Sequence, residues 1–224
     1  MIEIRHKETG ELLRSVDGDS LDGVYMDSAN LEGANMSGLS MVGTDFQNAN
    51  LKNADLRGAR LEKANLHSAI LAGADLENAN LSKADLTDAI MVGARCHNAN
   101  LTHAIARYAH VAEAEFVDAR MQGIDLSMSD ARANFTRAVL VKADFRGADL
   151  SGAVFEEADL SGANLHDAKM LDANLNGARI EGAISALGHR FSTKSASRPA
   201  VKSAAAAAMR SKQGASRPWW QFWG

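Results

Sequence analysis

Apolar residues recur at every fifth position along most of the chain. From Leu31 to Leu126 twenty such positions follow one another in steps of five, and seventeen of them are Leu, Met or Phe. The three exceptions are all uncharged: Cys96, Ala106 and Val111. Agreement on this scale identifies an internal repeat of five residues, in which each apolar position is the centre of one unit.

A second set of units, and an alanine that recurs two positions before the centre, support the repeat. Ten further centres run from Phe135 to Ile180 in steps of five, and each has alanine two positions before it. In the first block the same position is alanine in seventeen of twenty units, the exceptions being Leu39, Thr44 and Ile124. We expect little room for a larger side chain at this position.

A period of five predicts short strands rather than a helix. Successive centres on a helix would be turned by about 140° from one another and would scatter around its axis. On an extended segment the centre and the residue two before it share one side, while the residue between them points the other way. That intervening residue is polar in most units, as at Asn30, Asn50, Asp55, Asn65 and Asp75. Each unit therefore has an apolar inner side and a polar outer side.

The end of each unit has the composition of a tight turn. Twelve of the eighteen glycines lie two residues after a centre, as Gly58 and Gly73 do, and asparagine takes that position in other units. Glycine and asparagine best tolerate the backbone of such turns. Each unit is thus one short strand followed by a corner.

The unit Ala-Asp/Asn-Leu-x-x, present as residues 54–58 and 79–83, closely resembles the pentapeptide-repeat family over about residues 16–185. The resemblance implies an all-β fold, a right-handed quadrilateral β-solenoid of about eight coils with four units in each. Its centres and alanines would fill the interior. At a strand spacing of about 4.8 Å the rod would be ~40 Å long.

Two irregularities mark the boundaries and interior of this solenoid. Residues 1–15 contain two alternating segments around Thr9 and Gly10, which predict a hairpin that caps the first coil of a solenoid spanning residues 16–185. The spacing from Leu126 to Phe135 is nine instead of ten. A register slip, with a bulge or kink, is therefore expected at residues 127–134.

Residues 186–224 form a basic, alanine-rich tail. They contain seven Lys and Arg and no acidic residue, whereas residues 16–185 contain 25 acidic and 14 basic residues, a net charge of −11. Pro199, Ala204–Ala208 and Gly214 favour a short α-helix. The chain then ends in an aromatic segment, for which docking against a surface is expected, at Trp219, Trp220, Phe222 and Trp223.

The sequence indicates a binding protein that is not an enzyme and uses no cofactor or metal. Residues 1–7 lack an apolar signal core, so we expect a cytoplasmic protein. Cys96 cannot form an internal disulfide, because it is the only cysteine. With four units per coil, Cys96 faces inward and His97, His103 and His110 lie on three different faces, which excludes a zinc site among them. No catalytic triad or carboxylate pair stands out from the repeat.

Charge divides the expected faces. One face carries an acidic strip of Asp27, Asp45, Asp85, Asp88 and Asp125. Another carries Arg60, Lys63, Lys83 and Arg120 against Glu62. The acidic strip either reflects the repeat's preference for Asp and keeps the rod soluble, or imitates nucleic-acid phosphates. The latter role is implied by resemblance to the Qnr-type members of the family, which bind DNA topoisomerases such as gyrase. We expect no direct nucleic-acid binding by the solenoid.

A third face is a candidate contact surface, because outward positions that are usually polar become Ile70, Ala72, Ile90, Val92 and Ala112. The principal hypothesis is a non-catalytic scaffold that binds an unidentified protein partner through its rigid faces. A second copy of the chain, in a homodimer, or its own tail could occupy this patch. The alternatives are the Qnr-like DNA mimic and membrane-surface association through the basic, Trp-rich tail.

Overall fold

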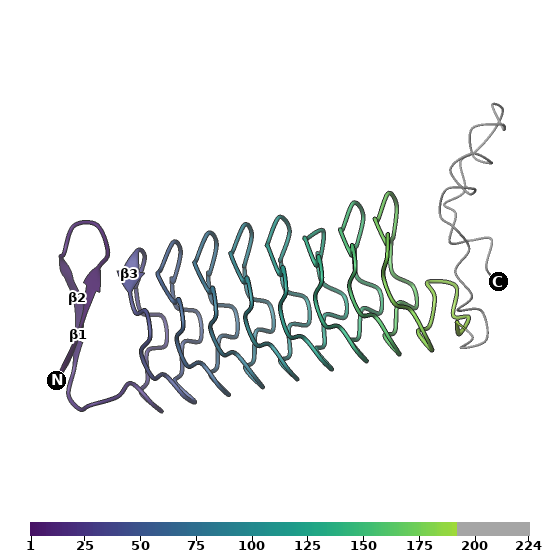
Figure 1. Ribbon diagram of the computed structural model, residues 1–224. Coiled ribbons are helices and arrows are strands. Elements are labelled where there is room, and N and C mark those ends of the chain that lie inside the picture. The colour runs from purple at the N-terminus through teal and green to yellow at the C-terminus, as the bar shows by residue number, and fades with distance from the viewer. Residues whose placement is uncertain (192–224) are drawn as a thin grey trace.

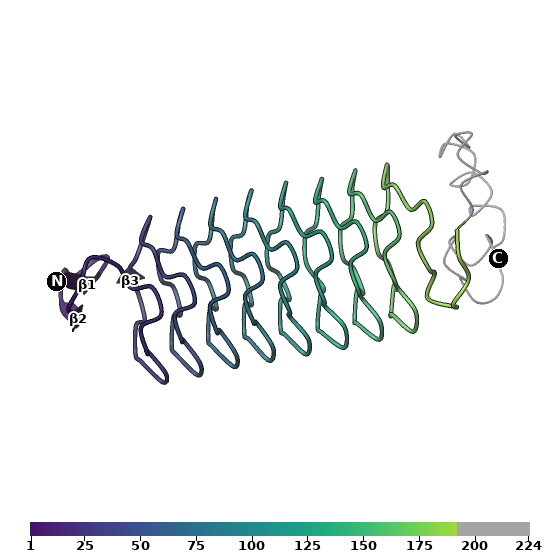
Figure 2. The same cartoon turned by 90° about the horizontal axis from the view of Figure 1, so that it is seen from below.

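The computed structural model describes residues 1–191 and shows a rod of stacked coils behind an N-terminal hairpin (Figure 1 and Figure 2). The coils are joined by isolated parallel bridges between residues twenty positions apart, as in Ile70 with Ile90 and Asp75 with Arg95. One column of these bridges runs from Tyr25 to Ile184 in eight steps. The expected all-β solenoid with twenty residues per coil is therefore present over this range.

Backbone hydrogen bonds explain why the unit has five residues. The amide of the centre Leu76 donates to the carbonyl of Arg95 in the next coil at 2.7 Å, and the amide of Asp75 donates to that of Ala54 in the previous coil at 2.9 Å. The amide of Ala79 donates back to the carbonyl of Leu76 at 3.0 Å and closes a turn. Asn78, the third residue of this turn, has a φ of 58°. A turn with a left-handed third residue selects glycine or asparagine there.

We name the four faces of the solenoid after the centres of one coil. Face A contains Leu86, face B contains Met91, face C contains Cys96 and face D contains Leu101. Centres twenty positions away lie on the same face, or nineteen positions away across the short unit described below. Faces B and D lie on opposite sides of each coil.

The interior is a continuous column of buried centres and alanines, and two of the three positions that lack alanine in the first block, Thr44 and Ile124, are also buried, whereas Leu39 is partly buried. Leu76 and most other centres are fully buried. Thr44 replaces alanine at a buried position, where its hydroxyl donates to the carbonyl of Leu21 at 2.6 Å. Ile124 also replaces alanine and is 1% exposed, so the interior accepts a larger side chain here. The neighbouring coil has the small centre Ala106 on the same face.

The register slip lies in a single turn. The bridges change from a spacing of twenty at His110 with Asp130 to nineteen at Glu115 with Asn134, and they continue on both sides. Within the unit 131–134 the amide of Ala133 donates to the carbonyl of Ala131 at 2.8 Å. The missing residue is thus absorbed by a tighter turn, and the ladder of bridges has no bulge there.

The N-terminal hairpin covers the first coil. Strands β1 (Ile2–His6) and β2 (Leu12–Val16) pair antiparallel, and β1 also pairs with β3 (Ala34–Asn35) in the solenoid. Ile4 of β1 is fully buried in the same core as the repeat centres. Gly33 adopts a φ of 65° and lies against the imidazole of His6, where a larger side chain would collide. The hairpin is therefore packed into the solenoid.

At the other end the chain turns back on itself. Ile184 forms an antiparallel bridge with Arg190, and the amide of Phe191 donates to the carbonyl of Ala183 at 2.8 Å. The helix expected near Pro199 lies outside the described residues. Within residues 1–191 no helix is long and apolar enough to cross a bilayer.

Candidate interaction surface

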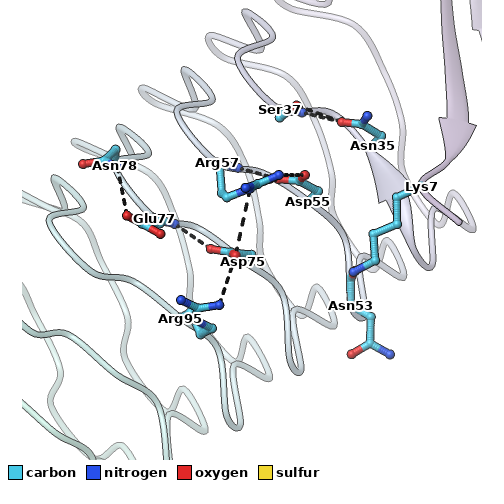
Figure 3. Close-up of polar contacts among 10 residues, drawn as sticks. All are labelled: Lys7, Asn35, Ser37, Asn53, Asp55, Arg57, Asp75, Glu77, Asn78 and Arg95. Atoms are coloured by element: carbon cyan, nitrogen blue, oxygen red, sulfur yellow. Dashed lines mark hydrogen bonds and ion pairs between the residues drawn. The ribbon is translucent and has the colours of Figure 1, made fainter.

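The outward Asp and Asn side chains have a structural role in the repeat. The residue before a centre accepts a hydrogen bond from the amide two positions later, as Asp75 does from Glu77 at 3.1 Å (Figure 3). On face C these carboxylates also bind arginines. Asp55 accepts two hydrogen bonds from Arg57, at 2.8 and 2.6 Å, which hold the pKa of Asp55 below its usual value. Charge on this face is thus neutralised within and between coils.

Face D differs because four of its cations lack acidic partners, although Arg60 on the same face pairs with Glu62 and Arg179 pairs with Asp159. Ten of the fourteen Lys and Arg residues in the solenoid have a carboxylate oxygen within 4.0 Å. The other four, which have no such partner within residues 1–191, are Lys63, Lys83, Arg120 and Lys142. All four lie on face D, which is the basic face expected from the sequence.

The acidic strip lies on face A, but it is not continuous. The column of bridges runs through Asp45, Asn65, Asp85, Ile105 and Asp125, so a neutral residue follows each of the first two carboxylates. Asp27 and Asp88 lie at neighbouring exposed positions. Three of the carboxylates also accept a backbone amide two residues later: Asp45, Asp85 and Asp125. These three positions serve the repeat itself, and Asp125 is further neutralised by an arginine at 3.5 Å.

The cysteine and histidines considered as metal ligands are kept apart. Cys96 is fully buried, and burial raises the pKa of its thiol far above the usual range. His97 on face C contacts Glu115, with 2.5 Å between the ring Nε2 and a carboxylate oxygen. His103 lies on face D and His110 on face B. No group of three metal-binding side chains occurs in the part of the chain that the structure describes.

We expect Cys96 to react with a thiol reagent orders of magnitude more slowly in the native protein than in denaturant. A buried thiol that stays protonated is a poor nucleophile, because the thiolate is the reactive form. The measurement is the rate of modification with and without urea. Equal rates, or binding of one zinc ion per chain, would contradict the inward position of Cys96.

The outward apolar residues of face B lie directly above one another. Ile70 bridges Ile90. The amide of Gly73 donates to the carbonyl of Val92 at 3.0 Å, which places Ala72 and Val92 in the adjoining column. Ile90 is 37% exposed and Val92 is 38% exposed. Ala112 continues the column one coil further and is partly buried.

Face A extends this surface around the corner. Ile105 is 44% exposed, Tyr108 is 49% exposed and Met128 is 57% exposed. The amide of Tyr108 donates to the carbonyl of Ser127 at 3.1 Å, which places Met128 beside Tyr108 in the next coil. We call Ile70, Ala72, Ile90, Val92, Ile105, Tyr108, Ala112 and Met128 the apolar patch. Between residues 26 and 170 the structure's exposed large hydrophobic residues all belong to this patch.

Sequence reasoning did not include the face A half of the patch, although a signal was present. Tyr108 and Met128 occupy the turn position two residues after a centre, where glycine and asparagine predominate. Their φ values are 59° and 62°. A bulky residue in the left-handed region is unfavourable by about 1 kcal/mol relative to glycine. An apolar side chain kept at that position is therefore a reason to look for a contact.

The aromatic tail residues proposed for docking, Trp219, Trp220, Phe222 and Trp223, lie outside the described residues. The structure therefore assigns them no position. A binding surface for these residues can be inferred only from their chemistry and from the surfaces of residues 1–191.

Comparison with known proteins agrees with the repeat. A family model for pentapeptide repeats matches in eight copies, over residues 25–62, 59–95, 94–130, 131–167 and 148–184. HetL from the cyanobacterium Nostoc sp. strain PCC 7120 is a pentapeptide repeat protein involved in heterocyst differentiation regulation. Its crystal structure is 34% identical over 76% of this chain and 78% of that chain, with a TM-score of 0.45.

Two structures of QnrB1, a plasmid-mediated fluoroquinolone resistance protein, are also similar. A trypsin-treated variant is 20% identical over 70% of this chain and 86% of that chain, with a TM-score of 0.48. The full-length protein is 22% identical over 71% and 90%, with a TM-score of 0.40. No curated protein sequence matches this chain.

Proposed function

The chain belongs to the pentapeptide-repeat family, and on that premise we propose that it is a non-catalytic scaffold which binds a protein partner through the apolar patch. Members of the family are right-handed quadrilateral β-helices, and the same handedness is proposed here. A stack of coils joined by hydrogen bonds keeps the backbone of each outward residue in a fixed position, so the surface is preorganised for binding.

The distribution of exposed apolar side chains is the observation that carries this proposal. Single exposed hydrophobic residues need no explanation, but a contiguous group rimmed by charge usually marks a contact surface. Ile90 and Val92 lie on face B of one coil, and Ile105 and Tyr108 lie on face A of the next coil, with Tyr108 at the turn that leads into face B. The β-propensity of isoleucine and valine could explain face B alone. It does not explain a tyrosine and a methionine at left-handed turn positions.

Face D, which lies opposite face B, supports a scaffolding role. Face D presents Lys63, Lys83, Arg120 and Lys142 without acidic partners within residues 1–191, whereas the apolar patch is on faces A and B. Exposed charges farther apart than a Debye length of about 10 Å act independently at moderate salt. Faces B and D can therefore contact different surfaces at the same time.

The test compares three versions of the full chain as bait: wild type, Ile90→Lys/Tyr108→Lys, and Ser82→Lys/Ser151→Lys as a control with the same added charge. We expect a stoichiometric protein partner to bind wild type and control, and to lose at least tenfold in affinity for the patch variant once it is purified. All four positions face outward, so circular dichroism should show the same fold in each version. Equal binding by all three versions would contradict the proposal.

The two alternatives make different predictions. A Qnr-like mimic of DNA requires a continuous acidic face, whereas Asn65 and Ile105 interrupt the acidic column of face A. That alternative predicts inhibition of gyrase supercoiling, which substitution of Asp45, Asp85 and Asp125 by Asn would abolish. Membrane association through the tail predicts co-sedimentation with anionic vesicles. Either result, with no partner lost by the patch variant, would replace the proposed function.

A further inference from the structure

The core of the solenoid is covered differently at its two ends. At the N-terminal end β1 places Ile4 in the core and pairs with the first coil through β3, so that Leu21 and Leu31 are fully buried. A solenoid end without such a cover exposes its core and the backbone edge of its last strands. The N-terminal hairpin prevents both.

The C-terminal end has only a partial cover within residues 1–191. Leu175 and Ile180 are the last centres of faces C and D, and both are partly exposed. Their counterparts one coil earlier, Phe155 and Leu160, are fully buried. Beside them Leu171 is 61% exposed. The last coil therefore leaves apolar surface uncovered.

The backbone of the last coil is open as well. The amides of Phe155 and Leu160 donate to carbonyls of the following coil, each at 2.7 Å. The amides of Leu175 and Ile180 have no such acceptor within residues 1–191. Unpaired strand edges favour pairing with any further segment that can reach them. The end thus requires both an apolar cover and backbone acceptors.

The chain itself continues from this end. Phe191 accepts from the amide of Gly182 at 3.1 Å, so the last described residue lies against the final coil. Residues 192–224 follow, with six Lys and Arg, no acidic residue and all three tryptophans of the protein. The final coil carries Asp172 and Glu181, which have no ion-pair partner within the described residues. The end thus offers two carboxylates that are unpaired within residues 1–191, and exposed leucines, to a segment with cations and tryptophans, while Arg190 adds one cation to the end and Arg179 is paired with Asp159.

We propose that residues 192–224 close the C-terminal end of the solenoid, with the aromatic segment 219–223 packed on Leu171, Leu175 and Leu187. Leu187 is 58% exposed next to the final coil. The 27 residues between Phe191 and Trp219 can span far more than one coil, at up to about 3.3 Å per residue. This cover is independent of the proposed partner-binding function.

The apolar patch is the alternative binding surface for residues 192–224, but the C-terminal end of the solenoid is the better match. Both are within reach, since Val92 and Leu171 are four coils apart, about 19 Å at the usual strand spacing. The end adds open backbone amides and free carboxylates to the apolar surface. Face D is excluded because its unpaired cations repel a basic segment.

Tryptophan fluorescence tests the proposal without a label, because all three tryptophans lie in 219–223 and the emission reports on this segment alone. Wild type should emit at shorter wavelength than the same protein in denaturant and resist acrylamide quenching. Leu171→Lys/Leu187→Lys should shift the emission to the denatured value. Ile70→Lys/Ile90→Lys adds the same charge at the patch and should leave the emission unchanged.

Hydrogen exchange gives a second measure on the same variants. The amides of Leu175 and Ile180 should exchange at least tenfold faster in the Leu171→Lys/Leu187→Lys variant than in wild type, while the amide of Leu76 should not change. Leu171 and Leu187 are exposed, so these substitutions leave the interior intact. Three results would overturn the proposal: a red shift from the patch variant instead, a denatured-like emission in wild type, or an emission and mass that change together on dilution. The last would identify a second copy as the cover.

Discussion

Leu76→Asp is expected to unfold the solenoid, whereas Leu76→Met leaves it folded at a loss of less than about 1.5 kcal/mol. Leu76 is fully buried between Leu56 and Cys96 on face C. A carboxylate there would have neither water nor a partner, and such a group is far costlier to bury than a methyl group. Chemical denaturation followed by circular dichroism measures both variants.

The control for Leu76→Asp places the same carboxylate on the outer side of the strand. Ile90 is 37% exposed, and Ile90→Asp should remain folded with a stability close to that of wild type. This comparison separates inward from outward positions with one substituent. A stable Leu76→Asp variant, or equal losses at Leu76 and Ile90, would show that the interior is not where the repeat places it.

The sequence predicts the inward residues of this protein well, because they repeat under one constraint. Each centre must fill the same space in every coil, so Leu76 and Cys96 could be assigned to the core from spacing alone. The hairpin segments were recognisable for a similar reason, since their alternation differs from the period of five. Strands β1 and β2 occupy those segments.

The outward surface was harder to predict, because nothing in the repeat constrains it as a whole. Spacing placed Ile90 above Ile70, but the ion pairs between coils depend on side-chain reach. Arg95 contacts Asp75 at 3.5 Å, whereas Lys83 has no acidic partner within residues 1–191. The turn at Tyr108 was missed because the pattern allows any residue there at a modest energetic cost. The exceptional residues of a repeat are thus better guides to its contacts than the consensus.

The shortened turn at 131–134 was also only partly predictable. The spacing revealed that a residue was missing from 127–134, but a bulge in the strand and a tighter turn satisfy the same count. Hydrogen bonding decides between them, since the bridges at Asp130 and Asn134 are both kept. Keeping the bridges preserves the backbone hydrogen bonds that Asp130 and Asn134 both donate and accept, which a bulge would disrupt.

Phe135→Ala is expected to destabilise the solenoid by about 3–5 kcal/mol. Phe135 directly follows the shortened turn, and its ring stacks on Phe116 at 5.3 Å and on Phe155 at 5.0 Å between centroids. The rings of Phe145 and Phe135 form a T-shaped pair, with 5.9 Å between their centroids. Removal of the Phe135 ring would leave a cavity in its own coil, lined by Phe116 and Phe155 of the two neighbouring coils. Because each coil contacts only its neighbours, hydrogen exchange on both sides of Phe135 should accompany the denaturation experiment.

Phe46 provides the matched control for the aromatic contacts of Phe135. Both side chains are fully buried, but Phe46 has no aromatic neighbour within the described residues. Each aromatic pair adds about 0.5–1.5 kcal/mol beyond the area it buries. Phe135→Leu should therefore cost at least ~1 kcal/mol more than Phe46→Leu, since three such pairs are lost. Equal losses of unfolding free energy for the two substitutions would mean that the stacked rings stabilise the core only by filling space. The short turn at 131–134 would then need no aromatic contacts.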